Sequence, residues 1–204
     1  NETITQSFIV LDITSPKYLV DSVIKDMINV GRNTYVNFST NWTDNLEIDS
    51  FIFSIDQGLG FKNSTSYKFG TSTGNISSNI TFITVSVGTN ISWIFIANDS
   101  SNNWNETNIK SFIVLDLTPP NWILDSVIKN ESTIFQNTMV NFSANWTDDI
   151  LLDSYLFSID TGAGYINTTS SSFGISEENV STNEILINST AGTNINWKFI
   201  VNDS

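Results

Sequence analysis

Cysteine and histidine are both absent from the 204 residues, and this double absence excludes several kinds of chemistry. Without cysteine the chain has no disulfide framework and no thiol nucleophile. Without histidine it lacks the commonest general base, the commonest metal ligand and the side chain that titrates near neutral pH. Catalytic groups built from Ser, His and Asp, or from Cys and His, are therefore excluded.

Basic residues are also few, since 8 Lys and Arg face 21 Asp and Glu and the net charge is −13. No basic patch can outweigh this charge, which argues against nucleic acid as a partner. A negative surface keeps chains apart and attracts cations. The longest apolar runs, such as Ser7–Ile13, are too short to span a membrane. The chain shows no signal peptide and begins in the middle of a pattern, as a mature or excised segment would.

The chain repeats itself with an offset of 104 residues, and 54 of the 100 comparable positions are identical. SFIVLDIT at Ser7–Thr14 returns as SFIVLDLT at Ser111–Thr118, and VNFSTNWTD at Val36–Asp44 returns as VNFSANWTD at Val140–Asp148. No insertion or deletion interrupts the register. The chain therefore contains two copies of one module.

The register of the repeat predicts where each module begins and ends. NETITQSFIVLD at the N-terminus matches NETNIKSFIVLD at Asn105–Asp116, which we expect to be the last strand of the first module. We therefore expect residues 1–14 to be a spare last strand, a donor or continuation strand, and residues 15–118 to be the first module. Residues 119–204 are then a second module that lacks its last strand.

Alternating polar and apolar residues predict strands throughout. In Val36–Thr43, odd and even positions separate into a polar and an apolar face, and Val140–Thr147 repeats this pattern. We expect about seven strands per module, which is typical of an all-β antiparallel sandwich. In the first module they cover roughly 19–26, 34–43, 49–56, 59–63, 65–69 with 79–87, 90–98 and 107–116, with a turn signal in FGTSTGN.

Several motifs point to a family. Trp42 and Trp146 each end the second strand, the junctions read DITSP and DLTPP, and ANDSSNNWNET occupies Ala97–Thr107. These features resemble fibronectin type III and related immunoglobulin-like repeats of large archaeal and bacterial cell-surface proteins. The resemblance implies two tandem immunoglobulin-like antiparallel β-sandwiches outside the cell, with both Trp side chains as core anchors. The lack of cysteine departs from antibody domains and fits the fibronectin-like branch.

Asn-x-Ser/Thr sequons occur sixteen times, whereas the Asn, Ser and Thr content predicts about seven by chance. In a strand, residues i and i+2 share a face, so glycans on Asn37 and Asn41 would cover the exposed face without reaching the core. We therefore predict a glycoprotein, in preference to a mere compositional bias. Apart from Asn1 and Asn202 at the two ends, the predicted sites are Asn37, Asn41, Asn63, Asn75, Asn79, Asn90, Asn98, Asn105, Asn130, Asn141, Asn145, Asn167, Asn179 and Asn188.

Motifs for catalysis or cofactors are weak. The GLG and GAG triplets follow strands but precede neither a helix nor a Lys, so they predict hairpin turns and not phosphate loops. Paired carboxylates are the remaining catalytic option, but Asp44, Asp49 and Asp56 fall in loops or at strand ends without a pocket. We therefore expect no enzyme.

Calcium is the one ion that the sequence makes worth considering, because Ca²⁺ takes six to eight oxygen ligands. Carboxylates near the module junctions could converge as they do in cadherins, although solvated turn carboxylates are the simpler interpretation and no EF-hand motif is present. The candidate ligands are Asp12, Asp21, Asp99, Asp116, Asp125 and Asp203.

The offset register suggests the function. A module without its last strand exposes an unpaired edge, and a spare strand of the same sequence could complete it in a neighbouring subunit, or the array could continue covalently. Both arrangements are head-to-tail and build linear assemblies. We expect a structural glycoprotein module of an extracellular filament, stalk or surface layer, with copies of itself as partners. An adhesin module that binds surface glycans or proteins, and spacer domains of a larger secreted enzyme, are the alternatives.

Overall fold

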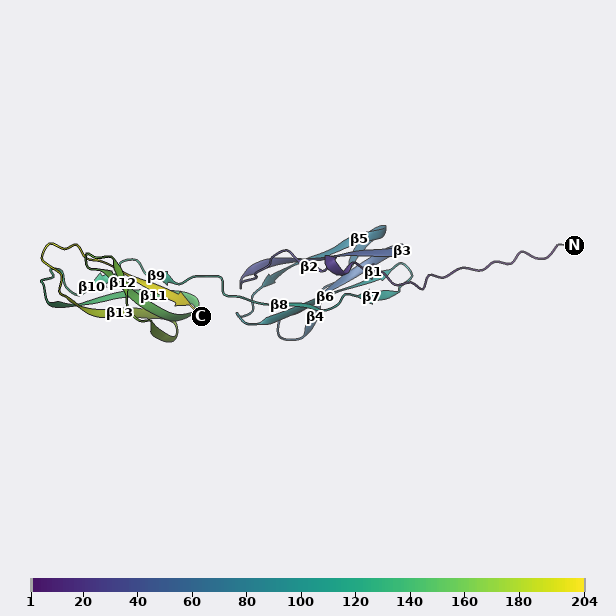
Figure 1. Ribbon diagram of the computed structural model, residues 1–204. Coiled ribbons are helices and arrows are strands. Elements are labelled where there is room, and N and C mark those ends of the chain that lie inside the picture. Colours follow the sequence, from purple (N-terminus) through teal and green to yellow (C-terminus); the bar gives the residue numbers. More distant parts are fainter. Residues whose placement is uncertain (1, 204) are drawn as a thin grey trace. The chain divides into compact units, whose positions relative to one another are not determined.

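The computed structural model describes residues 2–203, which are 60% β-strand and contain no α-helix (Figure 1). The chain divides into two compact units, Asn1–Leu115 and Asp116–Ser204, each of which is described by itself below. Two predicted features, the sequon at Asn1 and the end of the second module at Ser204, lie outside the described residues. No helix in residues 2–203 is long and apolar enough to cross a membrane, and η1 (Val20–Ser22) is a single 3-10 turn.

Unit 1 is built from eight strands that pair antiparallel, and one isolated parallel bridge joins Gly31 to Leu115. The longest strand pairs with five of the others, so it is the centre of the unit. The strands are β1 (Lys17–Tyr18), β2 (Ile24–Lys25), β3 (Thr34–Asp56), β4 (Phe61–Asn63), β5 (Tyr67–Ile83), β6 (Asn90–Asp99), β7 (Trp104–Glu106) and β8 (Lys110–Ile113).

The two halves of β3 have different partners. Residues 34–43 pair with β1, β2 and the second half of β5, whereas residues 48–56 pair with β4, β6 and the first half of β5. A register shift between Thr43 and Ile48 separates the halves. The sequence predicted two separate strands here. The strand is continuous instead because residues 44–47 contain neither glycine nor proline and stay extended.

β5 shows the same kind of difference. The predicted turn in FGTSTGN lies inside this strand, where Gly70 takes a φ of 80° and the pairing register shifts. Glycine tolerates this left-handed backbone conformation, so the turn signal produces an irregularity in the strand and does not end it. The predicted strand over 19–26 is likewise replaced by β1, η1 and β2.

The core of unit 1 lies between the two halves of β3. Val36, Phe38, Thr40 and Trp42 are at most 1% exposed, so the predicted inward row of this strand is confirmed. The ring of Phe38 lies 5.1 Å from that of Phe53 on the other half, which joins the two halves through aromatic contacts. Such contacts favour the sandwich-like arrangement because burial of aromatic side chains dominates the energetics of cores this small.

Unit 2 repeats this pairing pattern. β11 (Thr138–Asp160) takes the place of β3 and pairs antiparallel with every other strand of the unit. One edge of β14 (Asn196–Asp203) pairs with β11, and its outer edge has no partner among residues 2–203. Its core contains Val140, Phe142, Ala144 and Phe157, while Trp146 is only partly buried. The strands are β9 (Asn121–Trp122), β10 (Ile128–Lys129), β11 (Thr138–Asp160), β12 (Tyr165–Asn167), β13 (Ser171–Ile187) and β14 (Asn196–Asp203).

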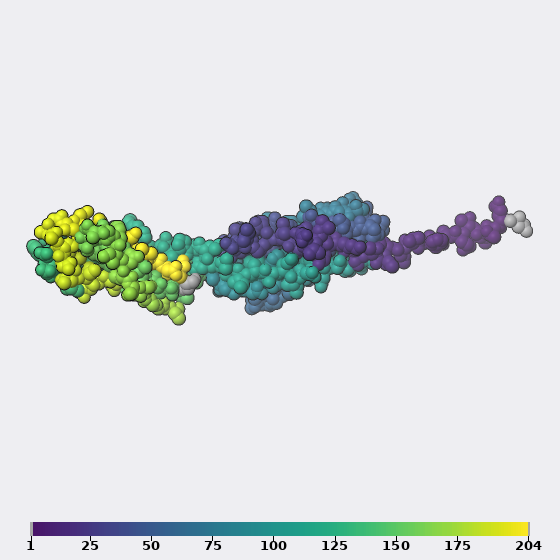
Figure 2. All heavy atoms as spheres, viewed as in Figure 1, coloured from purple at the N-terminus to yellow at the C-terminus, as the bar shows by residue number. Residues whose placement is uncertain are grey.

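The segment before β1 belongs to no strand. Residues 2–16 are extended without a sheet partner, and on the visible face of the molecule nothing covers the purple N-terminal segment (Figure 2). Phe8 and Val10 are 89% and 83% exposed, although their repeat counterparts Phe112 and Val114 are covered by unit 1. The same sequence is therefore packed in one place and exposed in the other.

Replacement of Trp42 by Ala should lower the free energy of unfolding of unit 1 by about 3–5 kcal/mol, because it leaves a cavity in the core. The indole also donates a hydrogen bond of 3.0 Å from Nε1 to Ser77 Oγ, which the variant loses. Trp104, which is 46% exposed, is the control, and its replacement by Ala should cost less than about 1 kcal/mol. Denaturant unfolding measures both, and equal losses would contradict the assignment of Trp42 to the core.

Candidate metal centre and glycosylation sites

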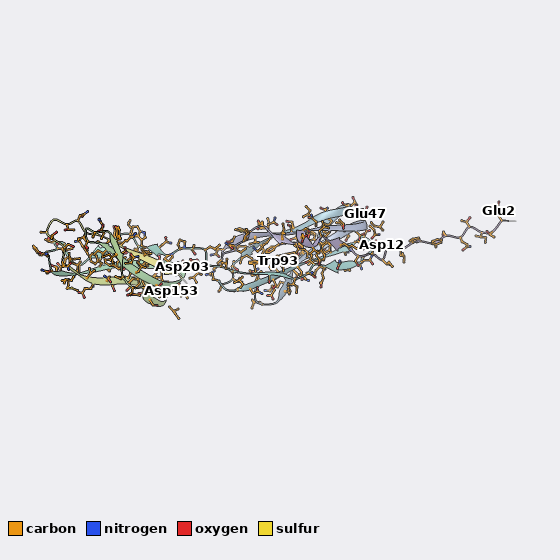
Figure 3. All side chains as sticks on the ribbon, viewed as in Figure 1. Glu2, Asp12, Glu47, Trp93, Asp153 and Asp203 are labelled. Atoms are coloured by element: carbon orange, nitrogen blue, oxygen red, sulfur yellow. The ribbon has the colours of Figure 1, made fainter. Side chains whose placement is uncertain are left out.

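Three carboxylates from separate parts of unit 1 meet at one point. Asp12 lies in the segment that enters the unit, Asp44 lies at the bend of β3, and Asp99 ends β6. One oxygen from each lies within 4.8 Å of the others. Figure 3 labels Asp12 at the end of unit 1 where the N-terminal segment joins it. We call this group the first aspartate triad.

The local backbone orients these carboxylates. In Asp12, Asp44 and Asp99, Oδ1 accepts the backbone N–H two residues further along the chain, at 3.0, 2.9 and 2.8 Å. Asp often forms this Asx-turn because its short side chain reaches the backbone N–H two residues further along the chain. The Oδ2 atoms of Asp12 and Asp44 are buried and have no hydrogen-bond partner. A buried oxygen without a partner costs free energy, so a ligand at this point would stabilise the fold.

Asp99 is the buried member of the triad, at 1% exposure. Asn103 donates its backbone N–H to Oδ1 and its side-chain Nδ2 to Oδ2, at 2.8 and 2.7 Å. The same Nδ2 lies 3.2 Å from the carbonyl oxygen of Asp12 and 3.3 Å from that of Thr14. Asn103 thereby links the entering segment to the loop after β6 and holds the carboxylate of Asp99 in place.

Unit 2 contains the corresponding residues, Asp116, Asp148 and Asp203, which we call the second aspartate triad. The Oδ2 atoms of Asp116 and Asp148 are again buried without a partner. Desolvation, followed by the charges of Asp116, Asp148 and Asp149, raises the pKa of the Asp203 carboxyl. The neighbouring carboxylates contribute to this shift because like charges disfavour ionisation.

The first triad shows the opposite effect on one of its members. Hydrogen bonds from the backbone of Thr14 and the side chain of Asn45 lower the pKa of Asp12, so this carboxyl stays ionised. Asp149 takes the place of Asn45 in unit 2, which makes the second site more negative. The single ion pair found within residues 2–203 joins Lys68 to Asp49, outside both triads. No basic side chain of the described chain therefore forms an ion pair with either triad.

The donor set determines which ions fit. The triads present carboxylate oxygens, which are among the ligands that Ca²⁺ prefers. Zinc sites are instead built mainly from nitrogen and sulfur ligands. A surface cavity of about 240 Å³ adjoins the first triad and gives access from solvent. It is lined by Thr14, Ser15, Lys17, Thr43, Asp44 and Asn45.

Two of the six candidate calcium ligands that the sequence suggested, Asp12 and Asp99, come together in the first triad. In unit 2 the charge of Asp116 contributes to the raised pKa of Asp203. Asp21 and Asp125 belong to neither triad, because Asp21 lies exposed in η1 and Asp125 lies in a turn with a φ of 66°.

Asp44 and Asp148 were not predicted as calcium ligands. The strand pattern could have indicated Asp44. It lies two residues after Trp42, in the row that contains Phe38, Thr40 and Trp42, so its side chain points toward the same face.

Compared with models of protein families and with curated protein sequences, the chain matches none.

The predicted glycosylation sites differ in accessibility. Eight of the fourteen side chains are exposed: Asn63, Asn75, Asn90, Asn130, Asn141, Asn145, Asn167 and Asn188. Five are partly buried: Asn37, Asn41, Asn79, Asn105 and Asn179. Asn98 is 6% exposed, and its Oδ1 accepts a hydrogen bond of 2.6 Å from Ser50 Oγ. Because Asn98 is this buried, we expect its side chain to remain unmodified in the folded unit.

Glycopeptide mass spectrometry of material from an N-glycosylating host should therefore find Asn98 unmodified. Exposed sequons such as Asn63, Asn141 and Asn167 should carry glycans, because their amide nitrogens are open to a transferase. Glycan on Asn98 would contradict the folded environment described above, and unmodified Asn at every exposed site would contradict the prediction of a glycoprotein.

Proposed function

We propose that this chain is a structural glycoprotein segment of an extracellular filament, stalk or surface layer, made of immunoglobulin-like, fibronectin III-like sandwiches that bind calcium. The observation that carries the proposal is the first aspartate triad, whose three carboxylates lie within 4.8 Å of one another and include two buried oxygens without a hydrogen-bond partner. The corresponding Asp116 and Asp148 of unit 2 also have buried Oδ2 atoms without a partner. Its role is mechanical and not catalytic. Copies of the chain are its partners, joined head to tail by strand complementation or within a longer covalent array.

The position of the triad supports a mechanical role. In unit 1, Asp12 belongs to the segment that enters the unit, whereas Asp44 and Asp99 belong to its strands. A cation bound by all three would fix the entering segment to the body of the unit. The carbonyl contacts of Asn103 and the hydrogen bond of 2.7 Å from Asn105 Nδ2 to Pro16 O already begin this attachment.

The chain connectivity strengthens this interpretation for the second triad. Leu115 is bound to unit 1 through its backbone N–H, which donates a hydrogen bond of 2.9 Å to the carbonyl of Val30. Asp116 follows it directly and is a member of the second triad. A cation on Asp116 would therefore fix the segment that enters unit 2 to the body of that unit, as proposed for Asp12 in unit 1.

Titration calorimetry with CaCl₂ should detect two ions per chain, with dissociation constants of about 10⁻⁴ to 10⁻³ M, as in other extracellular modules. At ten to a hundred times the dissociation constant, calcium should raise the free energy of unfolding of each unit by about 1.4–2.7 kcal/mol. Thermal unfolding in calcium and in chelator measures this gain. Equal melting temperatures in both would overturn the calcium site.

The variant Asp44→Asn should bind one calcium ion instead of two. The Asn side chain keeps an oxygen for the backbone N–H of Leu46, so the local turn is retained while one charge is removed. In chelator the variant should be at least as stable as the parent chain, because repulsion within the triad is reduced. Asp21→Asn is the matched control: it changes an exposed Asp outside both triads and should leave two ions bound.

A further inference from the structure

One face of unit 1 has a polar centre between two apolar rows. Its centre is the first half of β3, which lies between β2 on one side and the second half of β5 on the other. Because Phe38 and Trp42 are buried in the core, the residues that alternate with them point outward. These outward residues are Asn37, Ser39 and Asn41.

Three isoleucines flank this polar centre on the same face, since directly opposed residues of paired strands point to one side. The opposed pairs are Asn37 with Ile80, Asn41 with Ile76, and Ser39 with Ile24. Ile80, Ile76 and Ile24 are 68%, 60% and 51% exposed. Tyr35 and Phe82 extend the apolar surface at one end, with 4.6 Å between their ring centres. We call this surface the outer face of unit 1.

The arrangement of polarity on the outer face is the reverse of that in a contact between proteins. Such contacts have an apolar centre and a polar rim, whereas here the amides lie in the centre and the apolar side chains lie beside them. A second copy of the chain on this face would bury the amides in the middle of the contact, and a buried amide without a partner costs free energy. The apolar rows still favour a cover, because monomeric proteins rarely expose contiguous apolar surface. A cover that is attached at the centre and reaches the flanks satisfies both conditions.

The two central asparagines are sequon residues whose attachment atoms are free. Ser39 completes the sequon of Asn37, and Thr43 completes that of Asn41. Ser78 Oγ donates a hydrogen bond of 2.9 Å to Oδ1 of Asn37, which orients the amide and leaves its Nδ2 without a partner in the described part of the chain. The Nδ2 atom of Asn41 likewise forms no hydrogen bond with residues 2–203. About 13 Å of strand separates the two sites, so glycans on both can lie side by side.

We propose that the N-linked glycans of Asn37 and Asn41 lie along the outer face and cover its three isoleucines. This inference rests on the proposed function as a glycoprotein and names the sites where glycans contact the fold. One face of a sugar ring carries mainly C–H groups, which pack on apolar side chains, while its hydroxyl groups keep their contacts with water. Burial of apolar side chains that are otherwise exposed stabilises the folded unit.

The attachment needs a host transferase and a lipid-linked oligosaccharide phosphate as the sugar donor. The bond that forms joins Nδ2 of the asparagine to C1 of the first sugar, and the bond that breaks joins C1 to the phosphate oxygen of the donor. The phosphate leaves with that electron pair, and Nδ2 loses one of its two protons to a base of the transferase. The amide keeps its other N–H and its Oδ1, so the hydrogen bond from Ser78 to Asn37 is retained.

Unit 2 repeats the polar centre and most of its flanks. Its opposed pairs are Asn141 with Glu184, Asn145 with Val180, and Ser143 with Ile128. Val180 and Ile128 are 45% and 55% exposed, and both asparagines are exposed sequon residues. Glu184 stands where unit 1 has Ile80, so a glycan has less apolar surface to contact in this unit. We therefore expect glycans to stabilise unit 1 more than unit 2.

Thermal unfolding of the full chain from an N-glycosylating host tests the contact. Ser39→Ala with Thr43→Val removes both sequons and keeps Asn37 and Asn41 themselves. The melting temperature of unit 1 should fall by about 4–8 °C, the change expected for a modest loss of stability in a domain of this size. The same two chains from a host without N-glycosylation show what the substitutions do by themselves, and that difference is subtracted.

A matched control removes a glycan from elsewhere in the unit. Thr65→Val removes the sequon of Asn63, which is exposed on β4 and lies opposite the polar Ser54. Because this glycan has no isoleucine row beside it, its loss should cause less than half of the shift that loss of the two central sequons causes.

A further pair of variants tests the contact from the side of the protein. Ile76→Thr with Ile80→Glu removes apolar side chains from the outer face and keeps the sequons of Asn37 and Asn41. Glycosylation should then raise the melting temperature of unit 1 less than half as much as in the parent chain. Leu59→Thr is the control, because Leu59 is 85% exposed in the loop between β3 and β4, outside the outer face, and it should keep the full effect.

Three results would overturn this inference. They are unmodified Asn37 and Asn41 in a chain whose exposed sequons are occupied, a glycan effect that survives loss of both sequons or of both isoleucines, and association between copies that Ile76→Thr with Ile80→Glu weakens. The last result would make the outer face a contact between copies. None of them changes calcium binding, which titration calorimetry measures on the same chains, so the two proposals fail separately. Absence of glycan from every sequon would overturn this inference and the glycoprotein part of the proposed function together.

Discussion

Coverage of one strand edge is the constraint on which the rest of this structure depends. The aromatic core between the two halves of β3 is closed on its open side by β8, whose Phe112 packs on Trp93. Where an equivalent strand is absent from the described residues, the matching residue Trp197 becomes partly exposed and a groove opens beside it. An all-β unit this small cannot fully bury its aromatic side chains unless this edge is filled, because it has only a few strands to contribute.

The segment that fills the edge also supplies a charge. In Ser111–Asp116, the side chains of Phe112 and Val114 are covered within unit 1, whereas Asp116 belongs to the second aspartate triad with Asp148 and Asp203 of unit 2. Hydrophobic burial therefore attaches one end of the segment, and electrostatics attaches the other. A cation would convert mutual repulsion of the carboxylates into a bridge between the entering segment and the strands of the unit.

The alternation of apolar residues was sufficient to predict the inward row of Val36, Phe38, Thr40 and Trp42, because side chains in a strand point to opposite faces with a period of two. The same reasoning failed at residues 44–47 and at Gly70, where it expected breaks and the strands continue. Local composition does not show whether a bend ends a strand, since the answer depends on which strands pair on either side. For the triads, spacing along the chain indicated Asp12 and Asp99 but not Asp44.

By itself, the sequence determined the repeat, its 104-residue offset, the β-strands and their buried faces, because each of these follows from residue order and side-chain polarity. Only the tertiary structure decided that Asp44 joins Asp12 and Asp99, that Asp21 does not, and that Asn98 is buried against Ser50. These outcomes depend on contacts between residues that are tens of positions apart, and such contacts are set by strand pairing and not by any local pattern.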